Sequence, residues 1–191
     1  MPGIIGAVTG FIERQKGRGY VESSALQRMG KAAAAMAGGG NITVNVNAAA
    51  TSGNGADTTE DTIFTQTLPA NALDIVGRQI LVEAYGNVAA TSATKNARVY
   101  FGSTLLVNFA ATTTQTGVWA VTAYVTKAGS NSQSILVLTD TTISGSLVRS
   151  ASILSGTEAD NAGIVIKVTG QSSAATANLV TCNGLIIGGY N

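Results

Sequence analysis

The sequence predicts an all-β protein, a jelly-roll-like antiparallel β-sandwich preceded by an N-terminal extended arm that contains one short helix. The main observation is a series of short runs rich in Thr and Val, separated by glycine and asparagine turns. No helical pattern of useful length follows Gly38, which argues against parallel βαβ units. The Cys…Trp…Cys pattern of an immunoglobulin sandwich is missing from the sequence, which favours the jelly roll.

Residues 1–55 are predicted to be the arm and its linker. The apolar stretch at 3–12 is followed, not preceded, by basic residues, which is the wrong order for a signal peptide. Ser24 and Gln27 fit a capping box, strong helix formers follow, and three glycines end the run, so we expect a helix at about 24–37. One face of that helix carries apolar residues at helical spacing, namely Leu26, Met29, Ala33 and Met36.

Residues 41–47 alternate between apolar and polar and predict a short edge or arm strand, and an Ala/Thr/Ser/Gly linker follows it. We expect the sandwich to occupy residues 56–191. Its strands are expected at about 63–68, 79–86, 98–101, 104–110, 117–127, 134–139, 147–154, 163–169 and 179–187. Several strands have one clearly apolar face: Ile80, Val82 and Ala84; Leu105, Val107 and Phe109; Trp119, Val121, Ala123 and Val125.

Composition excludes most functional classes. The chain has no histidine, so His-based catalysis and His metal ligands are excluded, and its single cysteine cannot build a thiolate zinc site. Charged residues are 11% and the net charge is +1, which leaves no electrostatic footprint for nucleic acid. No apolar run approaches the ~18 residues that span a bilayer. We therefore expect no enzyme, no cofactor, and neither a nucleic acid nor a membrane as partner.

Two groups of loop carboxylates are the candidate polar sites. The first, Asp57, Glu60 and Asp61, is either a loop calcium site or a solvated loop, and its spacing does not match an EF-hand. The second pair, Glu158 and Asp160, presents the same choice. A glycosidase acid and base would require two such carboxylates in one cleft. The sequence favours solvated loops and leaves the cation question open.

Three other residue types have a structural and a functional interpretation. Trp119 is the only tryptophan, and it either stacks on a sugar ring or, as its alternation favours, lies in the core. The strand tyrosines at 85, 100 and 124 present the same alternatives. Cys182 is expected to be a small buried thiol.

The arm differs in net charge from the rest of the chain. Residues 1–31 have a net charge of +3 and the remainder has −2. The basic side chains are either solvated or dock on an acidic protein surface, where arginine pairs with carboxylates. The candidate docking residues are Arg14, Lys16, Arg18, Arg28 and Lys31, with the apolar Leu26, Met29 and Met36.

The sandwich region carries a set of motifs in a fixed order. FTQTLPAN at 64–71 is followed by Leu73, Gly77 and QILVEAYGN, then by RVYFGSTLLVN and GVWAVTAYVTKAGSNSQ, and finally by an apolar strand. This order resembles the β-sandwich domain of tailed-bacteriophage virion proteins, over residues 64–191. The motifs are structural and include no catalytic residue.

The resemblance, which extends to decoration, cement and head-fibre-type proteins, implies a structural virion protein, here a homotrimeric capsid decoration or cement protein. It would bind the phage major capsid protein on the capsid exterior, after assembly in the bacterial host cytoplasm. The anchoring role of the arm rests on its composition, because residues 1–55 lie outside the match. The alternative is a phage tail or fibre component that binds a host-surface glycan. A cellular lectin-like or cytokine-like module is a further alternative.

Overall fold

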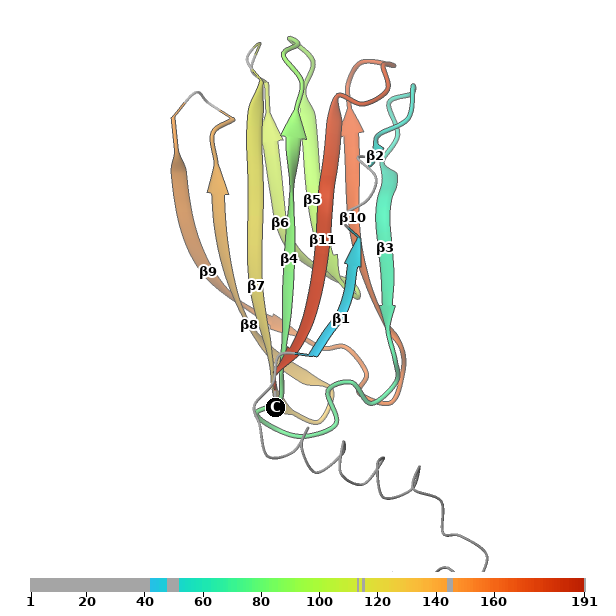
Figure 1. Cartoon of the computed structure of the whole chain (residues 1–191), viewed down its shortest axis with the longest axis vertical. Helices are drawn as coiled ribbons and strands as arrows, with labels where there is room; N and C mark the ends of the chain where they lie inside the picture. Colours follow the sequence, from blue (N-terminus) through green and yellow to red (C-terminus); the bar gives the residue numbers. More distant parts are fainter. Residues whose placement is uncertain (1–41, 48–51, 113, 115, 144–145, 191) are drawn as a thin grey trace, which may run out of the picture. The chain divides into compact units, whose positions relative to one another are not determined.

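The structure, a computed structural model, is a sandwich of two antiparallel sheets (Figure 1). It describes residues 42–47, 52–112, 114, 116–143 and 146–190. In these residues it contains eleven strands and no helix, so the predicted all-β sandwich is confirmed. No helix in the described part of the chain is long and apolar enough to cross a membrane.

The larger sheet has the order β1-β11-β4-β7-β8-β9, and β2 pairs with β11 beside this path. Its strands are β1 (Ile42–Asn47), β2 (Ser52–Gly53), β4 (Gln79–Val88), β7 (Gly117–Gly129), β8 (Ser132–Thr141), β9 (Val148–Gly156) and β11 (Val180–Tyr190). The smaller sheet has the order β3-β10-β5-β6. Its strands are β3 (Asp61–Leu68), β5 (Lys95–Phe101), β6 (Thr104–Ala111) and β10 (Ile164–Ser172).

The alternation of β4 and β7 places their apolar faces in the core as predicted. Along β7, every second residue from Trp119 to Val125 is buried, and the register brings Trp119 opposite Gly86 of β4. On β4, the three predicted residues Ile80, Val82 and Ala84 are also buried. Because side chains alternate across a strand, these two strands supply one wall of the core.

The predicted face of β6 is wrong at Leu105. A register shift lies where Val99 pairs with Val107 and Tyr100 with Leu105, so an extra residue sits between them. This β-bulge turns Leu106 into the core, where it is 4% exposed, and leaves Leu105 43% exposed. Simple alternation cannot foresee a bulge, because the period of two is broken by one residue.

Part of the segment predicted as arm and linker belongs to the larger sheet. β1 pairs with residues Leu185–Gly189 of β11, and β2 pairs with Thr181 and Cys182 of the same strand. The compact unit accordingly begins at Asn41, while the sequence placed the sandwich from residue 56. Asn54 follows β2 and holds this segment on β11, because its side-chain oxygen accepts a hydrogen bond from Val180 N at 2.9 Å.

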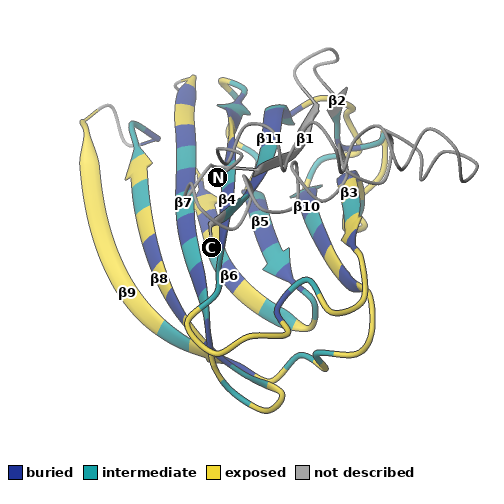
Figure 2. Cartoon of the chain, turned by 60° about the horizontal axis from the view of Figure 1, so that its bottom comes forward, coloured by how far each residue is buried: buried dark blue, intermediate teal, exposed yellow. Residues whose placement is uncertain are grey.

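The two sheets are unequal in width. The smaller sheet ends at β6, whereas the larger sheet continues from β7 through β8 to β9. Figure 2 draws β9 exposed along nearly its whole length, while the strands nearer the middle of the sheet alternate between buried and exposed residues. Within the described chain, β9 is therefore exposed on both faces from Val148 to Ile153, and only its end at Leu154 and Gly156 is packed against the core.

Candidate interaction surface

The first group of carboxylates does not converge on one point. Asp57 accepts hydrogen bonds from Thr59, at 2.8 Å from its backbone N and 2.7 Å from its hydroxyl. Asp61 accepts one from Gly55 N at 2.8 Å. The described residues contain no group of three or more Asp, Glu or Cys side chains placed to hold a metal ion. The solvated-loop interpretation fits these contacts, since each carboxylate stabilises its own turn.

Glu60 has a different role: it fastens the start of β3 across the smaller sheet. It accepts hydrogen bonds from Arg98 Nη1 at 2.7 Å, from Tyr100 Oη at 3.0 Å and from Thr169 Oγ1 at 2.5 Å. Lys167 lies over the Tyr100 ring, 4.6 Å from its centroid. Partial burial favours a higher pKa for Glu60, but these hydrogen bonds and cations outweigh it, so the pKa of the carboxyl is below its usual 4.5.

The second pair of carboxylates also diverges. Glu158 accepts hydrogen bonds at 2.7 Å from the backbone N and the hydroxyl of Ser103, in the β5–β6 turn. Asp160 forms an ion pair with Lys127, a side chain that is only 4% exposed, and accepts a hydrogen bond from Asn131 N. The two groups therefore join the β9–β10 loop to two neighbouring turns. This arrangement serves the fold and places no acid and base in a common cleft.

Trp119 lies in the core, as its alternation predicted. Its side chain is 0% exposed and its ring lies 5.5 Å from the Phe109 ring at an angle of 32°. A side chain on Gly86 would come within 2.6 Å of the indole, so the absence of a Cβ there makes room for it. A buried ring cannot stack on a sugar, and the sugar-stacking alternative for Trp119 is wrong.

The predicted buried thiol is confirmed. Cys182 is 0% exposed and its Sγ lies 3.3 Å from the carbonyl oxygen of Gly184. Burial raises the pKa of the thiol to about 11. At neutral pH Cys182 is therefore protonated and unreactive.

The candidate docking residues lie outside the described residues. This applies to the basic Arg14, Lys16, Arg18, Arg28 and Lys31, to the apolar Leu26, Met29 and Met36, and to the predicted helix at 24–37. Their docking role stays a prediction.

The surface that the sequence did not single out is the β8–β9 ribbon, defined as Ser132–Thr141 together with Val148–Gly156. Its outer face carries exposed apolar residues: Leu136 is 39% exposed, Leu138 is 38% exposed and Ile153 is 76% exposed. In the register, Leu136 lies opposite Ile153 and Leu138 opposite Ala151. Because directly opposed residues share one face, these four form a continuous apolar patch.

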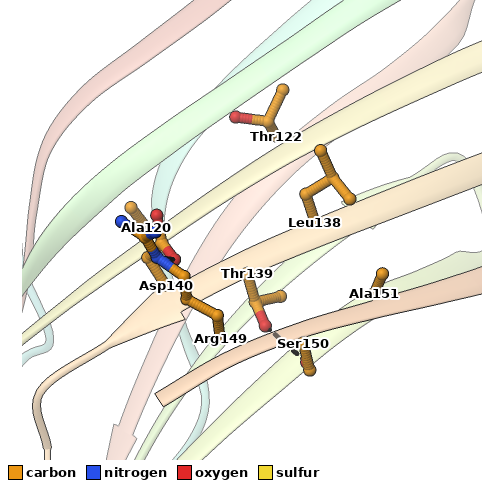
Figure 3. Close-up of a pocket in the computed structure, with 8 residues that line it drawn as sticks. All are labelled: Ala120, Thr122, Leu138, Thr139, Asp140, Arg149, Ser150 and Ala151. Atoms are coloured by element: carbon orange, nitrogen blue, oxygen red, sulfur yellow. Dashed lines mark hydrogen bonds and ion pairs between the residues drawn. The ribbon is translucent and has the colours of Figure 1, made fainter. Parts of the chain in front are cut away.

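A hollow of about 520 Å³ lies on this outer face, next to the patch (Figure 3). Its polar end is the ion pair between Asp140 and Arg149, whose Oδ1 and Nε atoms are 2.9 Å apart. The inner side of the ribbon borders a second hollow of about 340 Å³ between β6 and the overhanging strands, lined by residues that include Phe109, Val137 and Val148. Both hollows are shallow features of an overhanging sheet, and neither holds a convergent set of catalytic groups.

The strand run at 147–154 contained a signal for this surface. One face of β9 reads Val148, Ser150 and Ser152, and the other reads Arg149, Ala151 and Ile153. Neither face is consistently apolar, which is typical of a strand that is not packed on a core within its own chain.

Comparison with known proteins finds no matching family and no matching curated protein. Among solved structures, the chain is similar to one from the structure of infectious bursal disease virus Gx strain, with a TM-score of 0.31 and 12% identity. The alignment covers 79% of this chain and 32% of that chain, so this chain spans about a third of the length of the other.

Proposed function

We propose that this protein is a structural component of a phage virion, and more specifically a homotrimeric cement or decoration protein. In this proposal the N-terminal arm docks on the major capsid protein at the capsid exterior and stabilises the head. The observation that carries the proposal is the character of the described surface. The loop carboxylates bind other parts of the sandwich, whereas an uncharged apolar patch stays exposed on the β8–β9 ribbon.

The motifs behind the resemblance support a shared scaffold. Leu68, Leu73 and Trp119 are fully buried. Gly77 and Gly102 have φ values of 89° and 58°, which few residues other than glycine adopt at low cost. The residues common to the motifs are thus those that build the sandwich and its turns, as expected when a fold rather than a catalytic site is shared.

An assembly role also agrees with the low charge. Only 11% of residues are charged, against roughly 25% in an average soluble protein. Charge keeps free proteins apart in solution, and its scarcity is favourable where surfaces are covered by neighbours. Binding of many copies to an assembled lattice stabilises that lattice by mass action.

The first test is the copy number per particle, measured by quantitative mass spectrometry of purified virions. A copy number comparable to that of the major capsid protein is expected for a cement protein. A few copies per particle would contradict the capsid location and favour the tail or a single vertex. Absence from the particle would overturn the virion assignment.

The second test addresses the arm. The full-length chain with Arg14, Lys16, Arg18, Arg28 and Lys31 changed to glutamine should lose co-sedimentation with capsids that lack the native protein. The control is Arg78→Gln, which removes a cation outside both the arm and the β8–β9 ribbon. Equal co-sedimentation of the arm variant and the control would overturn the docking role of these five residues.

A further inference from the structure

The edge of β9 is an open hydrogen-bonding template. Among the described residues it is the last strand of the larger sheet, and its nine residues pair with β8 in continuous register without a bulge. Alternate residues of such a strand direct their N–H and C=O groups away from the sheet. Proteins usually blunt such edges with lysine, proline or a bulge, and β9 contains none of these.

Side-chain contacts with β8 also fix the position of the β9 edge. The hydroxyls of Thr139 and Ser150 lie 2.7 Å apart and join β9 to β8 through their side chains. Beside them, Asp140 and Arg149 form an ion pair across the same two strands. A strand fixed in this way presents its free groups in a regular row, which lowers the entropy cost of adding another strand.

The charges of β9 are compatible with a second copy of the same strand. Arg149 is its only charged residue, and Asp140 already neutralises it within the chain. The edge therefore offers no net charge that would attract a strongly charged partner. The seven residues after Arg149 are uncharged, so two copies can approach without like charges facing each other.

We propose that β9 pairs with β9 of a second copy, antiparallel about a two-fold axis near Ser152, so that the two larger sheets become one continuous sheet. This register places Ile153 of each copy beside Ala151 of the other and joins the two apolar patches. The two Arg149 residues then lie about six residues apart along the strands, or roughly 20 Å. At physiological salt that separation exceeds the screening length of about 8 Å.

This contact goes beyond the proposed function, because it is two-fold and joins copies in pairs. If the homotrimer of the proposed function also forms through other surfaces, the β9 contact joins one trimer to another. Closed two-fold contacts are self-complementary, which is the property that the uncharged centre of β9 provides.

The first experiment is the native mass of the full-length protein, by light scattering or native mass spectrometry. An even number of copies is expected, and Ile153→Lys should halve that mass while the far-ultraviolet circular dichroism stays unchanged. The matched control is Val165→Lys on β10, an equally polar change at a residue 41% exposed on the other sheet. A wild-type mass of one or three copies, or an unchanged mass of the Ile153 variant, would overturn the proposal; three copies would leave the proposed trimer intact.

The second experiment does not depend on how well a lysine is tolerated. Ser152→Cys should form an intermolecular disulfide under mild oxidation, because opposed antiparallel residues have Cα atoms about 4.5–5.5 Å apart, within disulfide range. Cys182 is buried and does not compete. Val118→Cys, a residue 49% exposed on the interior strand β7, is the control. Crosslinking of the Val118 variant to the same extent, or no crosslinking of the Ser152 variant, would contradict β9 pairing.

Discussion

Replacing Trp119 with alanine tests how much the stability of the sandwich core depends on this one ring. A buried tryptophan removes about 200 Å² of surface from water, or roughly 5 kcal/mol at 25 cal/mol per Å². Alanine keeps part of this, and truncation of a buried tryptophan usually costs about 3–5 kcal/mol. The core around the ring is held by a backbone that approaches closely at Gly86, so it has little freedom to collapse into the space.

The free energy of unfolding should therefore fall by about 3–5 kcal/mol, and the melting temperature by roughly 6–20 °C for a chain of this size. Urea unfolding followed by circular dichroism is the assay, since the variant lacks the only tryptophan. The control is Val118→Ala, one residue away on the opposite face and 49% exposed, for which a change within about 0.5 kcal/mol is expected. Equal losses for the two variants would refute the placement of Trp119.

A related substitution separates the ring from its polar atom. Trp119 Nε1 is buried without a hydrogen-bond partner among the described residues. Trp119→Phe keeps an aromatic ring and removes this N–H group, so its loss of stability should be clearly smaller than that of Trp119→Ala. A loss as large as that of the alanine variant would mean that the indole N–H has a partner.

Three further predictions concern single groups. Glu60 has a pKa below its usual 4.5 in the folded state, so its contribution to stability is present above pH 4.5 and is lost as the pH falls below that value. The variant Glu60→Gln should therefore lose less stability on acidification than the wild type, as measured by circular dichroism. An unchanged pH profile would contradict the hydrogen-bond network around Glu60. In the native protein, Cys182 should resist alkylation by iodoacetamide at pH 8, and it should react once urea unfolds the protein. Mass spectrometry detects the alkylated thiol. Rapid labelling of the native protein would contradict the burial of Cys182. Gly86→Ala should destabilise the protein more than Gly129→Ala. A Cβ at residue 86 would lie 1.9 Å from the Thr181 carbonyl oxygen, whereas a Cβ at residue 129 would lie 3.8 Å from its nearest neighbour. Equal melting temperatures of the two variants would refute this prediction.

The fold could be predicted where one face of a strand is consistently apolar. The periodicity of β4 and β7 identified the residues that these strands bury in the core, but not Leu81, which is buried on the other face of β4. Ends were less accurate: β5 begins at Lys95, three residues before the expected start at Arg98. Lys95 is fully buried, and its Nζ donates a hydrogen bond to the Thr91 carbonyl oxygen at 2.7 Å. No local sequence pattern predicts a buried lysine at the start of a strand.

The candidate surface could not be predicted in the same way. The carboxylates are rare in this sequence and were therefore candidates, yet those of Glu60, Glu158 and Asp160 contact residues 29 to 109 positions away that no motif connects to them. The β8–β9 ribbon has polar groups, but their spacing matches no catalytic or binding motif. The ribbon is exposed because the larger sheet extends beyond the smaller one. The number of strands in each sheet depends on the topology of the whole chain.

The interior position of β11 in the larger sheet has a consequence for how the protein is made. This strand lies between β1 and β4, and its partners in them are about 90 to 150 residues earlier in the chain. While β11 is still inside the ribosome, β4 has an unpaired edge in the middle of the future sheet and β1 has no partner. Such non-local pairing is slow, and it leaves an aggregation-prone edge exposed until synthesis passes residue 190. Ribosome-bound chains should therefore depend on chaperones that cover strand edges, and assembly of copies should begin only after each sandwich has closed around β11.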